Sequence, residues 1–341
     1  MDDFSKISKK IIEKINSVNR ILMHCHVRPD PDSVGSVLGM KLALEKLGKV
    51  VTVISGDDFP LDAVSFLPKF GEIVTKSFDQ VDFGQYDLYL CLDTGGREQI
   101  TYKKKVEFPL SIPTIVIDHH KTNPEFGEIN LVMPEISSCA EIVYLLLKDW
   151  NIDIDKEIAT CLYTGINADT GGFRFATVTA DTYRIAADLI ERGANFNEIM
   201  FKLSSIKFKN LLAFAKCLGE TKSYFNNRLV IAKIPLTRFH DLGIFGKDIS
   251  HTKELIAFQL SSCVEAEISV VIYEYDKLEN SSISIRSNNP KKIWDVSQLA
   301  SAMGGGGHRQ AAGGKYQGNI NEAEKFFLEV LKSIYPEFEK C

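Results

Sequence analysis

Short apolar runs alternate with helix-like stretches through the first half of the chain. Four of these runs have the length of buried strands, at residues 20–24, 50–54, 88–92 and 114–117. Apolar residues recur at helical spacing over 33–47, and an opening helix would present Ile11, Ile12, Ile15 and Val18 on one face. This alternation predicts an α/β fold, with βα units around a largely parallel sheet and helices that flank it.

The middle of the chain is expected to be mainly helical. Helical periodicity occurs in four segments: 140–150, 156–166, 180–192 and 208–218. Gly193 has the character of a helix stop after the third segment. These helices would cover the sheet and lead into a helical connector at 196–220.

The last third has the pattern of a second, smaller α/β domain. Asn226-Asn227 separates apolar segments at 222–225 and 229–234, as in a β-hairpin. Two further strands and a closing helix are expected at 267–275, 282–287 and 321–334. We therefore predict one domain at 1–195, the connector, and a second domain at 221–341.

Length and charge narrow the class of protein. The chain has 341 residues, more than one core usually supports, which agrees with two domains. Its formal net charge is -5 and its pI is about 5.9. Proteins that bind long nucleic acid through many phosphates usually have a basic surface. The composition therefore argues against a long nucleic-acid duplex as partner and leaves short, phosphate-bearing substrates open.

Cysteine usage and hydropathy indicate a cytoplasmic protein. The seven cysteines are odd in number and form no CxxC pair, which argues against a disulfide framework or a zinc knuckle. No run of 18 or more apolar residues is present, so we expect no membrane span and no membrane partner. The N-terminus also lacks the apolar segment of a signal peptide. The sequence leaves the oligomeric state open, a homodimer included.

Acidic residues and histidines follow the predicted strands at four places. Their positions are His24, His26, Asp30 and Asp32 after the first strand, Asp93 after the third, Asp118, His119 and His120 after the fourth, and Asp169 after the apolar stretch 159–166. Ligands of open α/β sheets bind beyond the carboxyl ends of the strands. Divalent cations would explain the gathering, because they neutralise carboxylates that otherwise repel each other. Carboxylate oxygen and imidazole nitrogen suit Mn²⁺ or Mg²⁺.

Each residue taken alone has an ordinary structural explanation. Asp30 and Asp32 lie in a proline-rich turn, where aspartate commonly caps a helix. Asp93 and Asp169 come shortly before glycines, as turn residues do. The histidine pair can be partly buried without binding anything. The joint pattern favours a metal site, because every member follows an apolar segment.

At these residues the sequence resembles the DHH phosphoesterase family. The triplet that gives the family its name is Asp118-His119-His120. Three further motifs match: His26-Val27-Arg28-Pro29-Asp30-Pro31-Asp32-Ser33, Leu92-Asp93-Thr94 and Asn167-Ala168-Asp169-Thr170-Gly171. The second half carries the signature of the associated C-terminal domain, with Ser284-Ile285-Arg286-Ser287 upstream of Gly304-Gly305-Gly306-Gly307-His308-Arg309-Gln310-Ala311-Ala312-Gly313. The resemblance therefore covers nearly the whole chain.

The resemblance implies two metal positions that share Asp93. The first would be held by His26 and Asp30, and the second by three further residues: Asp32, His119 and Asp169. Asp118 would orient the histidine pair, and His120 would be a neighbouring ligand or would face the phosphate. Asp93, Asp118, His119 and His120 would thus be the catalytic residues. His24 lies outside the motif and is expected to be structural.

The resemblance also implies a substrate-binding role for the second domain. Arg286 can hold a phosphate with two parallel hydrogen bonds. Backbone N–H groups of a glycine run can face an anion. The implied substrate-binding residues are Arg286, Ser287, Gly305, Gly306, Gly307 and His308. The substrate would lie in a cleft between the two domains.

One departure from the family pattern concerns the opening motif. Many members have glycine between its two acids, whereas this chain has Pro31. Proline fixes φ near about -65° and removes a backbone donor. Since both acids are retained, we expect the metals to bind. The fit of the substrate at this turn is the property that Pro31 could change.

The resemblance implies a phosphodiesterase with two Mn²⁺ ions, for which Mg²⁺ or Co²⁺ can substitute. Its substrates would be short oligoribonucleotides and linear dinucleotides, cleaved to nucleoside 5′-monophosphates, and adenosine 3′,5′-bisphosphate. An alternative with the same site is a phosphodiesterase for cyclic di-AMP or its linear product pApA. A long-strand exonuclease and a pyrophosphatase fit less well. The alternative of another class is a non-catalytic nucleotide-binding sensor, which would need a broken metal set.

Overall fold

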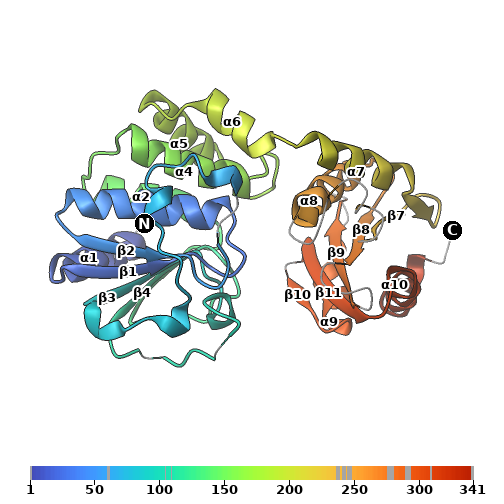
Figure 1. Ribbon diagram of the computed structural model, residues 1–341, viewed down its shortest axis with the longest axis horizontal. Coiled ribbons are helices and arrows are strands. Elements are labelled where there is room, and N and C mark those ends of the chain that lie inside the picture. Colours follow the sequence, from blue (N-terminus) through green and yellow to red (C-terminus); the bar gives the residue numbers. More distant parts are fainter. Residues whose placement is uncertain are drawn as a thin grey trace. The chain divides into compact units, whose positions relative to one another are not determined.

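The chain divides into two compact units, Met1–Ser205 and Ile206–Cys341 (Figure 1). The computed structural model describes residues 2–59, 62–103, 105–108, 110–235, 239, 243, 248–274, 280–288, 293–307 and 309–338. The sequence pattern predicts a separate helical connector at 196–220. In the structure, Ile199 of α6 (Phe196–Ser204) is buried in the core of the first unit. Ala213 of α7 (Phe208–Gly219) is buried in the second unit.

The first unit contains a five-stranded parallel sheet in the order β2-β1-β3-β4-β5. Its strands are β1 (Arg20–His24), β2 (Val50–Ile54), β3 (Leu88–Leu92), β4 (Thr114–Asp118) and β5 (Ile129–Val132). The four strands expected from the sequence are confirmed. The fifth was not predicted, because it is an edge strand in which only Leu131 is buried and the apolar run is interrupted by Asn130.

The α-helices that accompany this sheet in the described residues are α1 (Asp2–Asn16), α2 (Pro31–Lys46), α3 (Cys139–Asp149), α4 (Lys156–Asp169), α5 (Ala180–Glu191) and α6. Helix α2 lies between the sheet and helices α4 and α5 (Figure 1). Together α2 and α3 cover one face, where Ile21, Leu90 and Ile117 of the strands join the largest apolar core. This arrangement confirms the expected α/β class.

The opposite face of the sheet is covered by the irregular segments between the strands. Its core includes Leu22, Tyr89 and Val116 from the strands and Phe78 and Ile100 from the segments that cover them. His24 is fully buried on this face, and its Nδ1 lies 2.9 Å from the Tyr89 hydroxyl. Burial lowers the pKa of His24 to about 3, so the ring is neutral, as a structural histidine is.

The start of α2 explains Pro31. Asp30 is the N-cap, and its side chain accepts a hydrogen bond from the Ser33 N–H at 2.9 Å. Pro31 is the first helical residue, a position whose N–H has no partner in the helix and whose φ matches that of proline. The replacement of glycine by proline is therefore compatible with the backbone at this turn.

Helices α2 and α4 approach each other closely near the catalytic motif residues. A Cβ atom added to Gly35 would lie 2.5 Å from the Cys161 carbonyl oxygen of α4. Asp32 lies one turn before Gly35 in α2, and a Cβ atom added to Gly165 of α4 would lie 2.5 Å from the Asp32 Oδ1. Asp169 follows Gly165 by one turn of α4, so this packing sets the distance between the two acids. Glycine at position 35 is required by this backbone approach.

The second unit contains a mixed six-stranded sheet in the order β10-β11-β9-β8-β7-β6. Its strands are β6 (Lys222–Tyr224), β7 (Leu229–Ile234), β8 (Ile268–Glu274), β9 (Asn280–Ser287), β10 (Gly306–Gly307) and β11 (Ala311–Gln317). Among the strand pairs of the described residues, β7 and β8 alone are parallel. The predicted hairpin is confirmed, and Phe225, Asn226 and Asn227 of its loop adopt positive φ angles.

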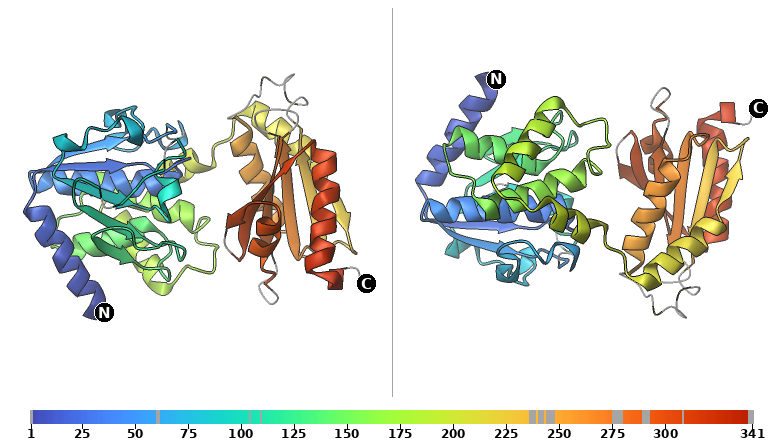
Figure 2. Two further views of the ribbon diagram at one scale, coloured as in Figure 1. Left: turned by 90° about the horizontal axis from the view of Figure 1, so that it is seen from below. Right: turned by 90° about the horizontal axis from the view of Figure 1, so that it is seen from above.

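Helices cover both faces of the second sheet (Figure 2). Helices α7 and α8 (Asp248–Ser261) pack on one face, and α9 (Val296–Ala302) and α10 (Ile320–Ile334) pack on the other. Strand β11 and helices α8 and α9 were not predicted. Glycine and alanine dominate the first half of β11, which is unlike a strand in composition. In the described part of the chain, no helix combines the length and hydropathy that a bilayer crossing requires.

The substitution Gly35→Ala should destabilise the first unit. The added methyl group meets a helix backbone that cannot turn aside, and overpacking of this kind costs about 1–3 kcal/mol. We expect a lower denaturation midpoint and weaker divalent-metal binding, since Asp32 and Asp169 are moved apart. The control is Gly219→Ala in α7, where an added Cβ meets nothing within 4 Å. Unchanged stability of Gly35→Ala would contradict the prediction.

Candidate metal centre

Three strand ends and two helix ends meet at one edge of the first sheet. His26 follows β1, Asp93 follows β3 and His119 follows β4, while Asp32 lies in the first turn of α2 and Asp169 ends α4. Their ligand atoms form groups within which all atoms lie within 4.8 Å of one another: His26–Asp30–Asp93, Asp32–His119–Asp169 and Asp93–His119–His120. The groups contain every residue that the sequence analysis expected to bind a metal.

Asp93 lies at the centre of the cluster, and its two carboxylate oxygens face different histidines. Oδ2 is 3.4 Å from His26 Nε2, and Oδ1 is 3.4 Å from His119 Nε2. Burial would raise the pKa of Asp93, but the contacts with His119 and His26 outweigh it and lower this pKa. A buried carboxylate with this orientation can bridge two cations.

His26 and Asp30 each use one side-chain atom for local structure and turn another into the centre. His26 Nδ1 lies 2.8 Å from the Val27 carbonyl oxygen, to which an Nδ1–H donates, and its Nε2 lies 3.5 Å from Asp30 Oδ2. Asp30 caps α2 with Oδ1. The capping and metal-binding interpretations of Asp30 are therefore compatible, because different oxygens serve the two roles.

Asp32 is fully buried against the start of α3. Its Oδ2 accepts a hydrogen bond from the Cys139 N–H at 2.7 Å, and its Oδ1 accepts from the Ala140 N–H at 3.0 Å and the Ser36 hydroxyl at 3.1 Å. The positive end of a helix dipole favours an anion at this position. Each carboxylate oxygen has two lone pairs, so Oδ2 keeps acceptor capacity toward a cation beside His119.

His119 and Asp169 are the remaining members of the predicted ligand set. His119 Nε2 lies 3.2 Å from Asp169 Oδ2. Two buried atoms of the cluster, His119 Nε2 and Asp93 Oδ2, have no hydrogen-bonding partner of suitable geometry. Buried polar atoms without such a partner are costly. They are the atoms that a bound cation would satisfy.

His120 is held from the side by Asp118. The His120 Nδ1 is 2.8 Å from Asp118 Oδ1, and the Asn123 side-chain amide donates to Asp118 Oδ2 at 2.7 Å. The same amide donates to the Thr94 carbonyl at 3.0 Å, which ties the Asp118 and Asp93 segments together. Asn123 was missed in the sequence, because a single asparagine in a loop carries no distinctive spacing.

Packing these charges together changes the proton affinity of several groups. Burial and the Asp93 and Asp169 carboxylates raise the pKa of Asp32 well above its usual value. Burial also raises the pKa of Asp169 to about 6, against the opposing contact with His119. Burial disfavours charged histidines, yet the facing carboxylates outweigh it and raise the pKa values of His26 and His119. The metal-free centre therefore holds protons near neutral pH.

Two of the loops that carry ligands contain residues in the left-handed region, which few residues other than glycine adopt. Arg28 has φ 56° and Asp93 has φ 52°. Gln99 joins these loops: its carbonyl accepts from the Val27 N–H at 2.8 Å, and its side-chain oxygen accepts from the Gly95 N–H at 2.6 Å. Like Asn123, Gln99 could not be singled out from the sequence.

The donors fit divalent cations of hard or borderline character. The three groups offer carboxylate oxygens and imidazole nitrogens, and none of the grouped residues in the described ranges is a cysteine. Such donors suit Mn²⁺ and Mg²⁺. The acids of the centre outnumber its protonated histidines, which leaves a net negative charge at this buried edge. A bound cation would neutralise that charge.

The predicted substrate-binding residues lie in the second unit. Arg286 is half-buried on β9, and its guanidinium donates to the Ser284 hydroxyl at 3.2 Å. Gly306 and Gly307 form β10, which pairs with β11. The glycine run is thus partly a strand rather than a free loop.

Two other members of this predicted set take part in local structure. The Ser287 hydroxyl accepts a hydrogen bond from the Trp294 N–H at 2.9 Å. The Gly305 N–H donates to the Ala300 carbonyl at 2.9 Å, at the end of α9. His308 lies outside the described residues. Binding of substrate by this set stays a prediction.

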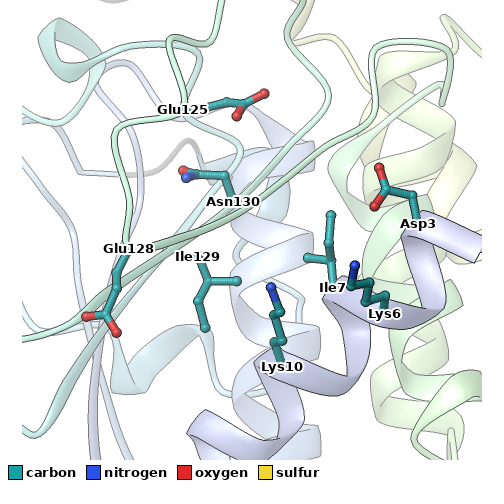
Figure 3. A pocket seen from close by; sticks show the side chains of 8 residues that line it. All are labelled: Asp3, Lys6, Ile7, Lys10, Glu125, Glu128, Ile129 and Asn130. Atoms are coloured by element: carbon teal, nitrogen blue, oxygen red, sulfur yellow. The ribbon is translucent and has the colours of Figure 1, made fainter.

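A separate pocket of about 280 Å³ lies where the first turns of α1 approach β5 (Figure 3). Its lining mixes Lys6 and Lys10 with Glu125 and Glu128. It is at the amino-terminal end of β5, whereas the ligand groups gather at the carboxyl ends of the strands. The pocket is therefore not part of the candidate metal centre.

Comparison with known proteins identifies the family. Residues 20–166 match the model of the DHH family, N-terminal domain. The bifunctional oligoribonuclease and PAP phosphatase NrnA of Thermus thermophilus is 30% identical over 92% of this chain and 89% of its own length. The chain belongs to the DHH family. The DHH-family relative of the same name from Bacillus subtilis is 26% identical over 97% of this chain and 99% of its own length.

A solved structure shares the architecture of both units. The crystal structure of an exopolyphosphatase-related protein from Bacteroides fragilis superposes with a TM-score of 0.86 and 25% sequence identity. The match covers 98% of each chain. The fold expected from the DHH resemblance is therefore confirmed over nearly the full length.

Metal binding should weaken as the pH falls. His26 and His119 must be neutral to bind a cation, and their raised pKa values mean that a cation displaces protons at neutral pH. For each proton displaced, we expect the apparent Mn²⁺ dissociation constant to rise about tenfold per unit of pH below about 7. Calorimetric titration in buffers of different ionisation enthalpy measures the protons released. Release of no protons at neutral pH would contradict the predicted protonation of the free centre.

Replacement of the bridging carboxylate should reduce the number of bound ions. Asp93→Asn keeps the shape of the side chain but removes its charge. We expect two Mn²⁺ ions per chain in the parent protein and at most one in the variant, measured by electron paramagnetic resonance titration. Asp181→Asn is the control, because Asp181 is exposed on α5. Two tightly bound ions in Asp93→Asn would rule out the bridging role.

Proposed function

We propose that this chain is a manganese-dependent phosphodiesterase. In this proposal it hydrolyses short oligoribonucleotides and linear dinucleotides to nucleoside 5′-monophosphates and also dephosphorylates adenosine 3′,5′-bisphosphate. The observation that carries the proposal is the buried Asp93 carboxylate, whose oxygens face two separate histidines within a complete set of ligands. The relatives described above, each a bifunctional oligoribonuclease and PAP phosphatase, support the choice of substrates.

We propose two cation positions, and the grouping of the side chains supports them. The proposed ligands are His26 and Asp30 at one position, Asp32, His119 and Asp169 at the other, and Asp93 at both. Cations bound at these positions would supply an activated water and would neutralise charge on the phosphate under attack. We choose Mn²⁺ because the donors combine carboxylates with imidazoles, and we expect Mg²⁺ or Co²⁺ to substitute.

His120 is the proposed proton donor of the centre. Its Nδ1 is fixed by Asp118, which sets the orientation of the ring. Burial opposes its charge, but the contacts with Asp118 and Asp93 raise the pKa of His120 above its usual value. A protonated ring can donate from Nε2 to a phosphate oxygen or to the departing oxygen.

The second unit would hold the terminal nucleotide. Arg286 is the proposed phosphate ligand, because a guanidinium can donate two parallel hydrogen bonds to a phosphate. Ser287, the glycines 305–307 and His308 would add hydrogen bonds to the same nucleotide. Firm binding of this distant part would position the scissile phosphate at the metal centre.

Charge and cysteine chemistry support a short substrate and a reducing compartment. The net charge of -5 is unfavourable for a long polyanion, whereas a few phosphates need only a local cationic site. Cys25, Cys91, Cys139 and Cys161 are buried thiols without disulfide bonds. We therefore propose that the enzyme acts in the cytoplasm on the products of RNA breakdown.

The substrate panel that tests this function contains RNA of two, five and twenty-four nucleotides, pApA, cyclic di-AMP and adenosine 3′,5′-bisphosphate, each with Mn²⁺. We expect the fastest release of mononucleotides from the dinucleotide and the pentanucleotide. Asp93→Asn should lower kcat by about 10³-fold or more, since metal ions contribute several kcal/mol of transition-state stabilisation. Asp181→Asn should retain full activity.

Each other outcome points to a different reading of the same centre. Cyclic di-AMP or pApA as the best substrate would replace the oligoribonuclease assignment with a role in signal turnover. Equal rates on the longest RNA would contradict the short-substrate assignment. Tight nucleotide binding with no turnover under any divalent metal would identify a sensor and overturn the catalytic proposal.

A further inference from the structure

The loop after Asp169 lies on the open side of the metal centre. Side chains deep in the cluster are nearly inaccessible, with exposures of 2% for Asp93, 10% for His26 and 14% for His119. Asp169 is 27% exposed and Asp30 is 47% exposed. A substrate must therefore approach past these two acids, and the residues that follow Asp169 border that approach.

This loop is tightly fixed although its backbone is unusual. Three successive residues, Gly171, Gly172 and Phe173, have φ between 58° and 68°. A positive φ is strained for a bulky residue such as Phe173. Thr170 compensates: its carbonyl accepts from the N–H groups of Arg174 (2.8 Å) and Phe175 (3.1 Å), and its hydroxyl accepts from the Phe173 N–H (3.0 Å).

Phe173 anchors the loop to the body of the unit. Its ring packs against the apolar core and stacks on Tyr183 of α5, with centroids 5.3 Å apart and an interplanar angle of 22°. The Tyr183 hydroxyl also donates to the Phe173 carbonyl at 3.4 Å. The inward ring and the hydrogen bonds together hold the strained backbone in one conformation.

Phe175 is presented outward by this anchored loop. Its side chain is 51% exposed, an unfavourable state for a large apolar ring. The ring tip lies over Gly171, because a Cβ atom added to Gly171 would come within 2.6 Å of it. Gly171 is two residues after the ligand Asp169, so the ring lies close to the metal centre. Tyr183, which is also exposed, is stacked on Phe173.

We propose that Phe175 is a stacking platform for a nucleobase of the substrate, the base next to the phosphate held at the metal centre. We choose a base as the binding partner because Phe175 is a half-exposed aromatic ring held close to the proposed phosphoester site. The flat face of a base can stack on such a ring. Stacking of this kind tolerates any base, which suits an enzyme of short RNA. The inference rests on the proposed function and adds a base-binding subsite in the first unit.

The test compares Phe175→Leu, which removes the ring but stays apolar, with Phe175→Trp, which restores a stacking surface. Phe201→Leu in α6 is the matched control, because Phe201 is also exposed. The first probe is a dinucleotide that contains 2-aminopurine and a non-hydrolysable methylenephosphonate linkage, bound in the presence of Mn²⁺. Stacking on a ring quenches 2-aminopurine fluorescence. We expect quenching with the parent protein, Phe175→Trp and Phe201→Leu, and its loss with Phe175→Leu.

Steady-state kinetics supply the second readout. Loss of one stacked base should raise KM for a dinucleotide by about 5- to 100-fold, with kcat little changed. A dinucleotide analogue without its bases should be cleaved equally by the parent protein and Phe175→Leu. Equal Mn²⁺ binding by both proteins would show that the metal centre is intact.

The outcomes separate the platform from the proposed reaction. If the parent protein cleaves dinucleotides and Phe175→Leu has the same KM and the same quenching, the platform is refuted and the reaction stands. If KM rises equally for the analogue without bases, Phe175 is only structural and the platform is refuted. If no substrate turns over but quenching depends on the ring at position 175, the platform stands and the proposed reaction fails.

Discussion

Electrostatic repulsion among the acids at the carboxyl edge of the first sheet is the constraint that the surrounding structure must satisfy. Asp32 and Asp93 are buried and Asp30 and Asp169 face them from the open side, so the charges of the two buried acids are weakly screened. Helix α3 offsets one charge by directing two backbone N–H groups at Asp32. Protons on His26 and His119 offset others in the absence of metal. The remaining requirement for positive charge is the physical reason for divalent ions.

The positions of the ligands depend on backbone that is held from several directions. Parallel strands bring β1, β3 and β4 to the same edge, but the conformation after each strand is set by local contacts. Asp93 keeps a positive φ, while Gln99 and Asn123 bond to the segments around it. The close approach of α2 and α4 then fixes Asp32 relative to Asp169. A cation at this edge thus finds its ligands already placed by neutral and backbone groups.

The sheet of the first unit and its ligand set could be predicted because both leave periodic signals in the sequence. Strands β1 and β3 are short apolar runs, and each is followed by a ligand at the carboxyl end. Strand β5 left no such signal, since Asn130 interrupts its short apolar run and only Leu131 of its four residues is buried. Gln99 also could not be predicted, because its role depends on two loops that meet only in the folded chain. The raised pKa of Asp169 follows from burial, which no local pattern reveals.

Pro31 has a consequence for the exchange of metal ions. Proline restricts its own φ and also disfavours helical backbone at the preceding residue. That residue, Asp30, accordingly has an extended conformation, with φ -94° and ψ 177°. Both restrictions persist when the surrounding contacts loosen, because they are covalent and steric. The opening loop therefore loses less conformational entropy on closing around a cation than a glycine-containing loop would. After a cation leaves, the opening loop would therefore stay close to the conformation in which it binds the metal.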